Sequence, residues 1–129
     1  MGQHVGLVAL LVRDYDEAID FYTQKLGFNL VEDSDQGGGR RWVVIAPPGG
    51  NETRLLLARA EGASQQARVG DQTGGRVFLF LMTDDFARDH ERLSAAGVVF
   101  LEAPRHERYG SVAVFEDLYG NKWDLLQPA

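Results

Sequence analysis

Apolar positions in the first half of the chain follow two different periods. Residues 5–12 are almost wholly apolar, which is typical of a strand covered on both faces. Apolar side chains then recur at helical spacing from Tyr15 to Leu26, between an N-capping Asp14 and Gly27, and this predicts an amphipathic helix over 14–26. The segments 28–32, 41–45 and 54–59 are extended again, and the polar segment 33–39 is expected to be a turn. The pattern predicts a strand, a helix and three further strands.

The second half of the chain repeats this order after a polar connection over 61–75. Residues 76–82 form a predicted strand, Asp84 is expected to cap a helix that ends at Gly97, and three strands follow at 98–101, 111–115 and 123–126. Asp14 lies as far from Gly27 as Asp84 lies from Gly97, which indicates a structural duplication. We therefore predict one α+β domain over 1–129, made of a βαβββ module at 1–60 and another at 76–129.

The last two predicted strands form a β-hairpin. Gly120 and Asn121 suit the positive φ angles of its tight turn. In the second arm, Asp124 stands between Trp123 and Leu125, so that one carboxylate lies in an otherwise apolar wall. A buried acid needs a partner or a functional role.

Three motifs carry a resemblance to a known family. They are VRDYDEAIDFY at 12–22, LGF at 26–28 and DLYGN at 117–121. With the duplicated βαβββ order, they resemble the glyoxalase, bleomycin-resistance and extradiol-dioxygenase superfamily, the vicinal oxygen chelate proteins. The resemblance implies mixed sheets that curl into an open, barrel-like cavity. It also implies a homodimer, and the sequence leaves open whether the cavity is intrachain or shared across that dimer.

The resemblance also places the family's metal-ligand positions on this chain. In metal-using members they lie on the first and last strand of each module, and here they correspond to Leu7, Leu56, Arg76 and Asp124. Two leucines cannot donate to a metal and an arginine repels one, so we expect neither a metal nor another cofactor. The three histidines His4, His90 and His106 are interpreted as structural or surface residues.

The same alignment predicts a binding pocket, because side chains two apart share a face of a strand. Arg76 and Asp124 are expected to face each other as an ion pair that is either purely structural or presents Arg76 to an anionic ligand group. Trp42 is a candidate for stacking on an aromatic ligand, although the sequence does not decide whether Arg41 or Trp42 faces the pocket. The predicted ligand-binding residues are Arg76, Asp124, Phe78, Phe80, Leu7, Leu56, Arg54 and Trp42.

Charge and composition narrow the choice of partners. The net charge of −6 and the absence of long basic runs disfavour binding to nucleic acid or to anionic lipid. No apolar segment approaches the ~18 residues that cross a bilayer, and no signal peptide is recognisable, so we expect a cytoplasmic protein.

Three hypotheses of function remain, and the sequence does not decide whether the protein is an enzyme. The first is metal-free binding of a small, aromatic or anionic organic molecule, as in bleomycin-resistance proteins. The second is a metal-free isomerase or lyase with Asp124 as general base and Arg76 as oxyanion stabiliser, although an adjacent Arg76 would lower the pKa of Asp124. The third is a divergent metal-dependent lyase or dioxygenase of the same superfamily.

Overall fold

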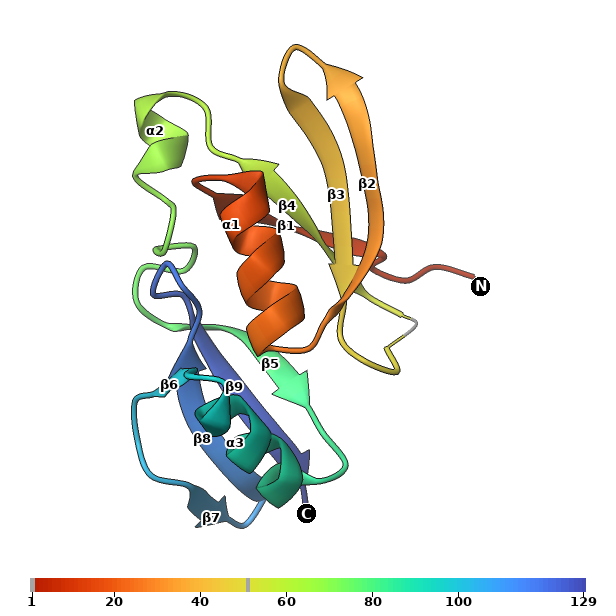
Figure 1. Cartoon of the computed structure of the whole chain (residues 1–129). Helices are drawn as coiled ribbons and strands as arrows, with labels where there is room; N and C mark the ends of the chain where they lie inside the picture. Colours follow the sequence, from red (N-terminus) through yellow and green to blue (C-terminus); the bar gives the residue numbers. More distant parts are fainter. Residues whose placement is uncertain (1, 51) are drawn as a thin grey trace. The chain divides into compact units, whose positions relative to one another are not determined.

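The α+β fold predicted from the sequence is present in a computed structural model that describes residues 2–50 and 52–129 (Figure 1). The contacts within the chain divide it into two units, Met1–Val69 and Gly70–Ala129, and each unit has its own mixed sheet. The boundary between the units falls within the predicted connection, 61–75. A single domain with modules at 1–60 and 76–129 stays a prediction.

Unit 1 contains a four-stranded sheet with strand order β1-β4-β3-β2. Only the β1–β4 pair is parallel. In Figure 1 the helix α1 crosses one face of this sheet. Its elements are β1 (Leu7–Val12), α1 (Tyr15–Asp20), the π-helical turn η1 (Phe21–Lys25), β2 (Asn29–Gly37), β3 (Arg40–Ala46), β4 (Arg54–Arg59) and α2 (Gly62–Gln66).

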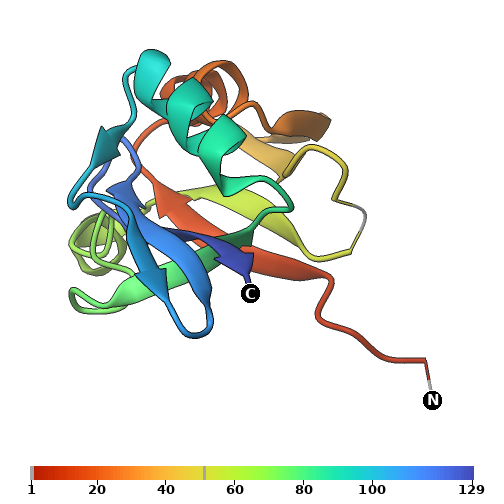
Figure 2. The ribbon, with the colours of Figure 1, turned by 90° about the horizontal axis from the view of Figure 1, so that it is seen from below.

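Unit 2 repeats this topology with strand order β5-β9-β8-β6, and a short strand, β7, also pairs with β8. Figures 1 and 2 both show α3 lying along one face of the sheet. The elements are β5 (Val77–Met82), α3 (Phe86–Ala95), β6 (Val99–Phe100), β7 (Arg105–Glu107), β8 (Gly110–Glu116) and β9 (Lys122–Pro128).

Each unit buries the helix-facing side of its sheet. The alternation along the strands turns one set of apolar side chains toward the helices, as the sequence pattern predicted. The fully or almost fully buried set comprises Leu10, Val12, Tyr22, Leu26, Val43, Ile45 and Leu57 in unit 1, and Leu93, Ala113, Phe115, Trp123 and Leu125 in unit 2. The opposite face of each sheet is therefore available for a site.

The helix caps are partly as predicted. Asp14 caps α1, and its carboxylate accepts a hydrogen bond from the Glu17 N–H at 2.9 Å. The predicted cap at Asp84 is wrong, because Asp85 holds that position and accepts from the Arg88 N–H at 3.1 Å. Asp84 lies one residue too early for this bond, and its carboxylate instead pairs with the Arg88 side chain.

Three segments differ from the expected secondary structure. Residues 33–37, expected as a turn, belong to β2, because their backbone pairs with β3 as far as the Gly37–Arg40 position. The polar composition reflects exposure at the edge of the sheet, and the turn itself needs only Gly38 and Gly39, both with positive φ. The pattern also missed α2 and β7, which are short and polar.

The β8–β9 hairpin forms as predicted, but its turn uses the two residues differently. Gly120 has φ +92°, whereas Asn121 is not in the positive-φ region. Asn121 is buried, and its Nδ2 donates to the Asp117 carboxylate at 2.9 Å. The Asn121 N–H donates to the same carboxylate at 2.9 Å, so side-chain bonding fixes this position.

Candidate functional site

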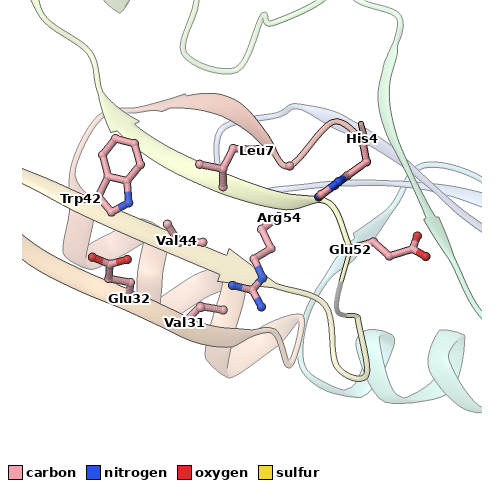
Figure 3. Close-up of a pocket in the computed structure, with 9 residues that line it drawn as sticks. His4, Leu7, Val31, Glu32, Trp42, Val44, Glu52 and Arg54 are labelled. Atoms are coloured by element: carbon pink, nitrogen blue, oxygen red, sulfur yellow. The ribbon is translucent and has the colours of Figure 1, made fainter. Parts of the chain in front are cut away.

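A groove of about 350 Å³ opens on the sheet of unit 1, on the face that α1 does not cover (Figure 3). Its floor is apolar, and several charged or aromatic side chains rise around it. The groove is lined by His4, Gly6, Leu7, Val31, Glu32, Trp42, Val44, Glu52 and Arg54.

Strand register brings these residues together. Leu7 on β1 pairs with Arg54 on β4, and Val44 on β3 pairs with Glu32 on β2. A register shift between Leu30 and Glu32 leaves Val31 as an additional residue on β2, where it joins the lining. Side chains from all four strands therefore meet on one face.

Trp42, and not Arg41, faces the groove. The Trp42 side chain lines the groove and is 39% exposed. Arg41 points to the opposite face, where its guanidinium pairs with Asp16 at 2.9 Å and Asp33 at 2.7 Å. It also lies over the Tyr15 ring, 5.1 Å from the centroid. The structure thus decides an alternative that the sequence left open, and an exposed indole forms one wall of the groove.

Two of the charged residues that line the groove, Arg54 and Glu32, keep unused hydrogen-bonding capacity. The Arg54 guanidinium makes no hydrogen bond or ion pair to any residue that the structure describes, and in Figure 3 it projects across β3 toward Val31. Glu32 accepts one hydrogen bond, from the Ser34 hydroxyl to Oε2 at 2.8 Å. Its Oε1 has no such partner within 2–50 and 52–129, so both side chains remain available to a ligand.

Unit 2 has a hollow at the equivalent place in its own sheet. It measures about 320 Å³ and is lined by Gly75, Val77, Leu101, Glu102, Val114 and Lys122. Four of these residues match groove residues with a constant difference of 70 in residue number: Leu7 and Val77, Val31 and Leu101, Glu32 and Glu102, and Val44 and Val114. Lys122 pairs with Val77 as Arg54 pairs with Leu7. The duplication of the fold therefore extends to this hollow.

The charged side chains of the unit 2 hollow form hydrogen bonds with other groups of the protein. Glu102 accepts from the Val114 N–H and from Arg105 Nε, both at 2.9 Å, and the bond to Arg105 lowers the pKa of Glu102. Lys122 Nζ donates to the Gly75 carbonyl at 3.1 Å. Among the described residues, the Arg54 guanidinium and Glu32 Oε1 of the unit 1 groove have no such partner, so these groups can bond to a ligand.

The predicted ion pair between Arg76 and Asp124 is wrong. Arg76 lies before β5 begins, and a bulge between Val77 and Leu79 shifts the pairing with β9 by one residue. The bulge reverses the alternation, so that Phe80 pairs with Asp124 while Phe78 has no partner on β9. A sequence reading assumes an unbroken strand and cannot place this shift.

Asp124 has a different environment from the one expected. Its Oδ1 is buried without a hydrogen-bond partner in the described part of the chain. Burial raises the pKa of Asp124 above its ordinary value, and the effect of Glu102 adds to it, although Arg105 acts in the opposite direction. The lowering that we expected from an adjacent Arg76 does not occur.

The positions that bind a metal in some members of the resembled superfamily do not fit one here. Leu7 and Leu56 supply no donor atom, and Arg76 is cationic. Within 2–50 and 52–129, no group of three His, Asp or Glu side chains is placed to hold a metal ion. His90 lies between Phe86 and Phe100, with ring centroids 5.5 and 4.3 Å away. His106 Nδ1 contacts the Ser111 hydroxyl at 3.0 Å.

The structure adds groove residues that the sequence reasoning missed. Leu7, Arg54 and Trp42 were predicted and do line the groove. His4, which was interpreted as a structural or surface residue, also lines it, and Val31, Glu32, Val44 and Glu52 were not named. The constant difference of 70 residues between the halves was a usable signal for Glu32, because it matches Glu102. Val31 also matches Leu101 at this difference, but the bulge that brings Val31 into the lining could not be placed from the sequence of its own strand.

The family model described as Glyoxalase/Bleomycin resistance protein/Dioxygenase superfamily matches residues 4–125, and the chain belongs to this superfamily. An uncharacterized protein of Shewanella frigidimarina (strain NCIMB 400) is 57% identical, over 98% of this chain and 95% of its own. The uncharacterized protein YetH of Bacillus subtilis (strain 168) is 30% identical, over 98% of this chain and 100% of its own.

Solved structures of the same fold include a protein described as a binder. UcmS2 superposes with a TM-score of 0.84 at 30% identity, covering 98% of each chain. TnmS3, an antibiotic binding protein from Streptomyces sp. CB03234, superposes with a TM-score of 0.79 at 34% identity, covering 98% of this chain and 97% of its own. Among the described residues, no helix is long and apolar enough to cross a membrane.

Proposed function

We propose that the protein binds a small, planar aromatic organic molecule in the groove of unit 1, without a metal. The observation that carries the proposal is the exposed Trp42 indole beside an apolar floor and the free Arg54 guanidinium. Aromatic rings stack on an indole face, and a guanidinium recognises an anionic or polarised oxygen. The similarity to an antibiotic binding protein supports binding as the activity.

The groove has dimensions and polarity that agree with such a ligand. Pockets for small molecules are concave and mostly apolar, with a few convergent polar groups, and commonly measure about 300–1,000 Å³. Leu7, Arg54 and Trp42 lie in the lining of this groove, and Leu56 pairs with Val44 on the adjacent strand. A ligand role for Arg76, Phe78, Phe80 and Asp124, all in unit 2, stays a prediction.

Calorimetric titration with a naphthalene derivative tests the proposal. Loss of the stacking surface in Trp42→Ala is expected to weaken binding about tenfold, since a pair of stacked aromatic rings contributes about 0.5–1.5 kcal/mol. Tyr109→Ala is the matched control, because it removes an exposed ring, 54% accessible, from unit 2. Equal affinity in wild type and Trp42→Ala would contradict binding of the ligand in this groove.

The metal-free part of the proposal has its own measurement. Elemental analysis of the purified protein is expected to find no stoichiometric transition metal, because Leu7 and Leu56 offer no donor atoms. Stoichiometric zinc, nickel, iron or manganese would favour a divergent metal-dependent lyase or dioxygenase instead.

A second candidate function is an isomerase or lyase reaction with Asp124 as general base. The raised pKa and the unpartnered Oδ1 of Asp124 favour it, because a base with a raised pKa holds a proton more readily. Arg76 supplies no ion pair to Asp124, so the reaction would lack the oxyanion partner that the sequence suggested. An Asp124→Asn variant that turns over a naphthalene carbonyl compound as fast as wild type would exclude this candidate.

We also infer a homodimer located in the cytoplasm. The outer strand β5 carries two large apolar side chains that are more than half exposed, Phe80 at 57% and Met82 at 54%, and a second copy of the chain would cover them. Light scattering on the purified protein tests the dimer, and a monomer mass at all concentrations would contradict it.

Cell fractionation tests the cytoplasmic location, and recovery of the protein outside the cytoplasmic fraction would contradict it.

A further inference from the structure

Charged groups of opposite sign lie apart in the unit 1 groove. In Figure 3 Trp42 and Glu32 lie together at one end and Arg54 lies in the middle, with His4 and Glu52 beyond it. The apolar residues Leu7, Val31 and Val44 lie between or beside them. A ligand that lies along the groove from this end therefore meets a carboxylate beside an indole first and the Arg54 guanidinium farther along.

Glu32 and Arg54 lie on strands that are not adjacent, and they do not pair with each other in the described structure. Glu32 is on β2 and Arg54 on β4, with β3 between them, so their backbones are two strand spacings apart, roughly 10 Å. No ion pair joins the two side chains in the described structure. Each has spare hydrogen-bonding capacity on the open face of the sheet, Oε1 of Glu32 and the whole guanidinium of Arg54.

In the equivalent hollow of unit 2, the charged side chains at these positions form hydrogen bonds within the protein. There Glu102 bonds to Arg105 and to the Val114 N–H, and Lys122 bonds to the Gly75 carbonyl. The same two positions in unit 1, Glu32 and Arg54, lack those internal partners. The contrast indicates that the unit 1 charges are kept for an external molecule.

We infer that the groove selects a zwitterionic aromatic ligand, in which a ring system carries a cationic group at one end and a carboxylate at the other. The cationic group pairs with Glu32 and lies against the Trp42 ring, which attracts cations through its π face. The carboxylate takes a two-pronged hydrogen bond from Arg54. This inference rests on the proposed function, because it assumes that the groove holds an aromatic molecule.

Three probes that share one ring system separate the two charges. They are 6-(aminomethyl)-2-naphthoate, which is zwitterionic, 2-naphthoate, which is anionic, and 2-naphthylmethylamine, which is cationic. Calorimetric titration of the full chain at low salt is expected to show the zwitterion binding at least about tenfold more tightly than either singly charged probe, because a charge-assisted hydrogen bond is lost in each.

Two variants then assign each charge to its residue. Arg54→Gln is expected to weaken the zwitterion and the anion about tenfold and to leave the cation unchanged, whereas Glu32→Gln weakens the zwitterion and the cation and leaves the anion unchanged. Lys122→Gln is the matched control at the equivalent position of unit 2 and should alter none of the three. Far-UV circular dichroism of each variant confirms that it is folded.

The outcomes separate the inference from the function on which it rests. Equal affinity for the three probes, with both variants indistinguishable from wild type, would overturn the zwitterion selectivity and leave aromatic binding intact. Tighter binding of the anion than of the zwitterion would also overturn it, since Glu32 would then repel or ignore the cationic end. Absence of binding for all three probes would overturn the proposed function and the inference together.

Discussion

Arg54 and Lys122 occupy the same place in the two sheets, yet among the residues that the structure describes only the Lys122 side chain has a hydrogen-bond partner. Each pairs with the first residue of the first strand of its unit, Leu7 for Arg54 and Val77 for Lys122. The Lys122 ammonium bonds to the Gly75 carbonyl at 3.1 Å, and the Arg54 side chain bonds to no residue within the described ranges. The duplicated position thus carries a positive charge in both units, but only in unit 2 does the described structure bind that charge internally.

The two tryptophans are predicted to respond differently to a soluble quencher. Trp42 is 39% exposed in the groove, whereas Trp123 is 3% exposed beneath α3. Acrylamide is therefore expected to quench wild-type fluorescence in two phases, and Trp42→Phe should leave only the protected emission of Trp123. A groove ligand that covers Trp42 should abolish the accessible phase. A single protected phase in wild type would contradict the exposure of the indole.

Arg41 is predicted to support unit 1 through its contacts with Asp16, Asp33 and Tyr15. Arg41→Met keeps much of the aliphatic stem but removes the charge, and it is expected to lower the free energy of unfolding by about 1 kcal/mol, because partly exposed ion pairs contribute little. Chemical denaturation measures the change. Arg40→Met is the control, since the Arg40 pair with Glu61 is more exposed and should matter less.

The Arg41 contact also predicts a pH dependence. The hydrogen bond from Arg41 lowers the pKa of Asp33 below its ordinary value of 3.8. A lowered pKa in the folded state contributes stability that is present above pH 4 and is lost as the pH falls through the folded value. As the pH falls below about 4, wild type should therefore lose more stability than Arg41→Met. Parallel curves for the two proteins would show that the pair does not act on Asp33.

Asp124 is predicted to have the opposite pH dependence. Burial raises its pKa, so its contribution to stability is present below about pH 4 and is lost as the pH rises through the folded value. Asp124→Asn removes the titration and should raise the unfolding temperature at pH 7 by a few °C, with the gain shrinking under acid conditions. Calorimetric scans at pH 4 and pH 7 measure it. A variant less stable than wild type at pH 7 would show that the charged carboxylate is stabilising.

A pair of glycines separates steric contact from backbone strain. Gly70 and Gly74 both have positive φ, +79° and +67°. A Cβ at Gly70 would overlap the Tyr119 carbonyl oxygen, whereas a Cβ at Gly74 would meet nothing within 4 Å. Gly74→Ala should cost about 1 kcal/mol for the strained φ alone, and Gly70→Ala several kcal/mol. Denaturant titration measures both, and equal losses would mean that the Tyr119 loop yields readily.

The fold was largely predictable, because it depends on signals that are local in the sequence. The Asp14 cap, the helical spacing to Leu26 and the alternation in the strands specify each element through short-range geometry. The duplicated order then specifies the topology. The errors at 33–37 and at β7 occur where polar residues form a strand only because a neighbouring strand pairs with them. The error at Asp84 is a choice between two adjacent carboxylates, of which Asp85 caps the helix.

The sequence by itself determined the βαβββ order, the apolar strand faces and the lack of donors at Leu7 and Leu56. Only the tertiary structure decided which charges meet. The bulge in β5 separates Arg76 from Asp124, and the β2–β3 register turns Trp42 and Glu32 into one groove with Arg54. One inserted residue reverses every side chain beyond it, and bulges depend on pairing between strands that are distant in the chain, so spacing alone cannot place them.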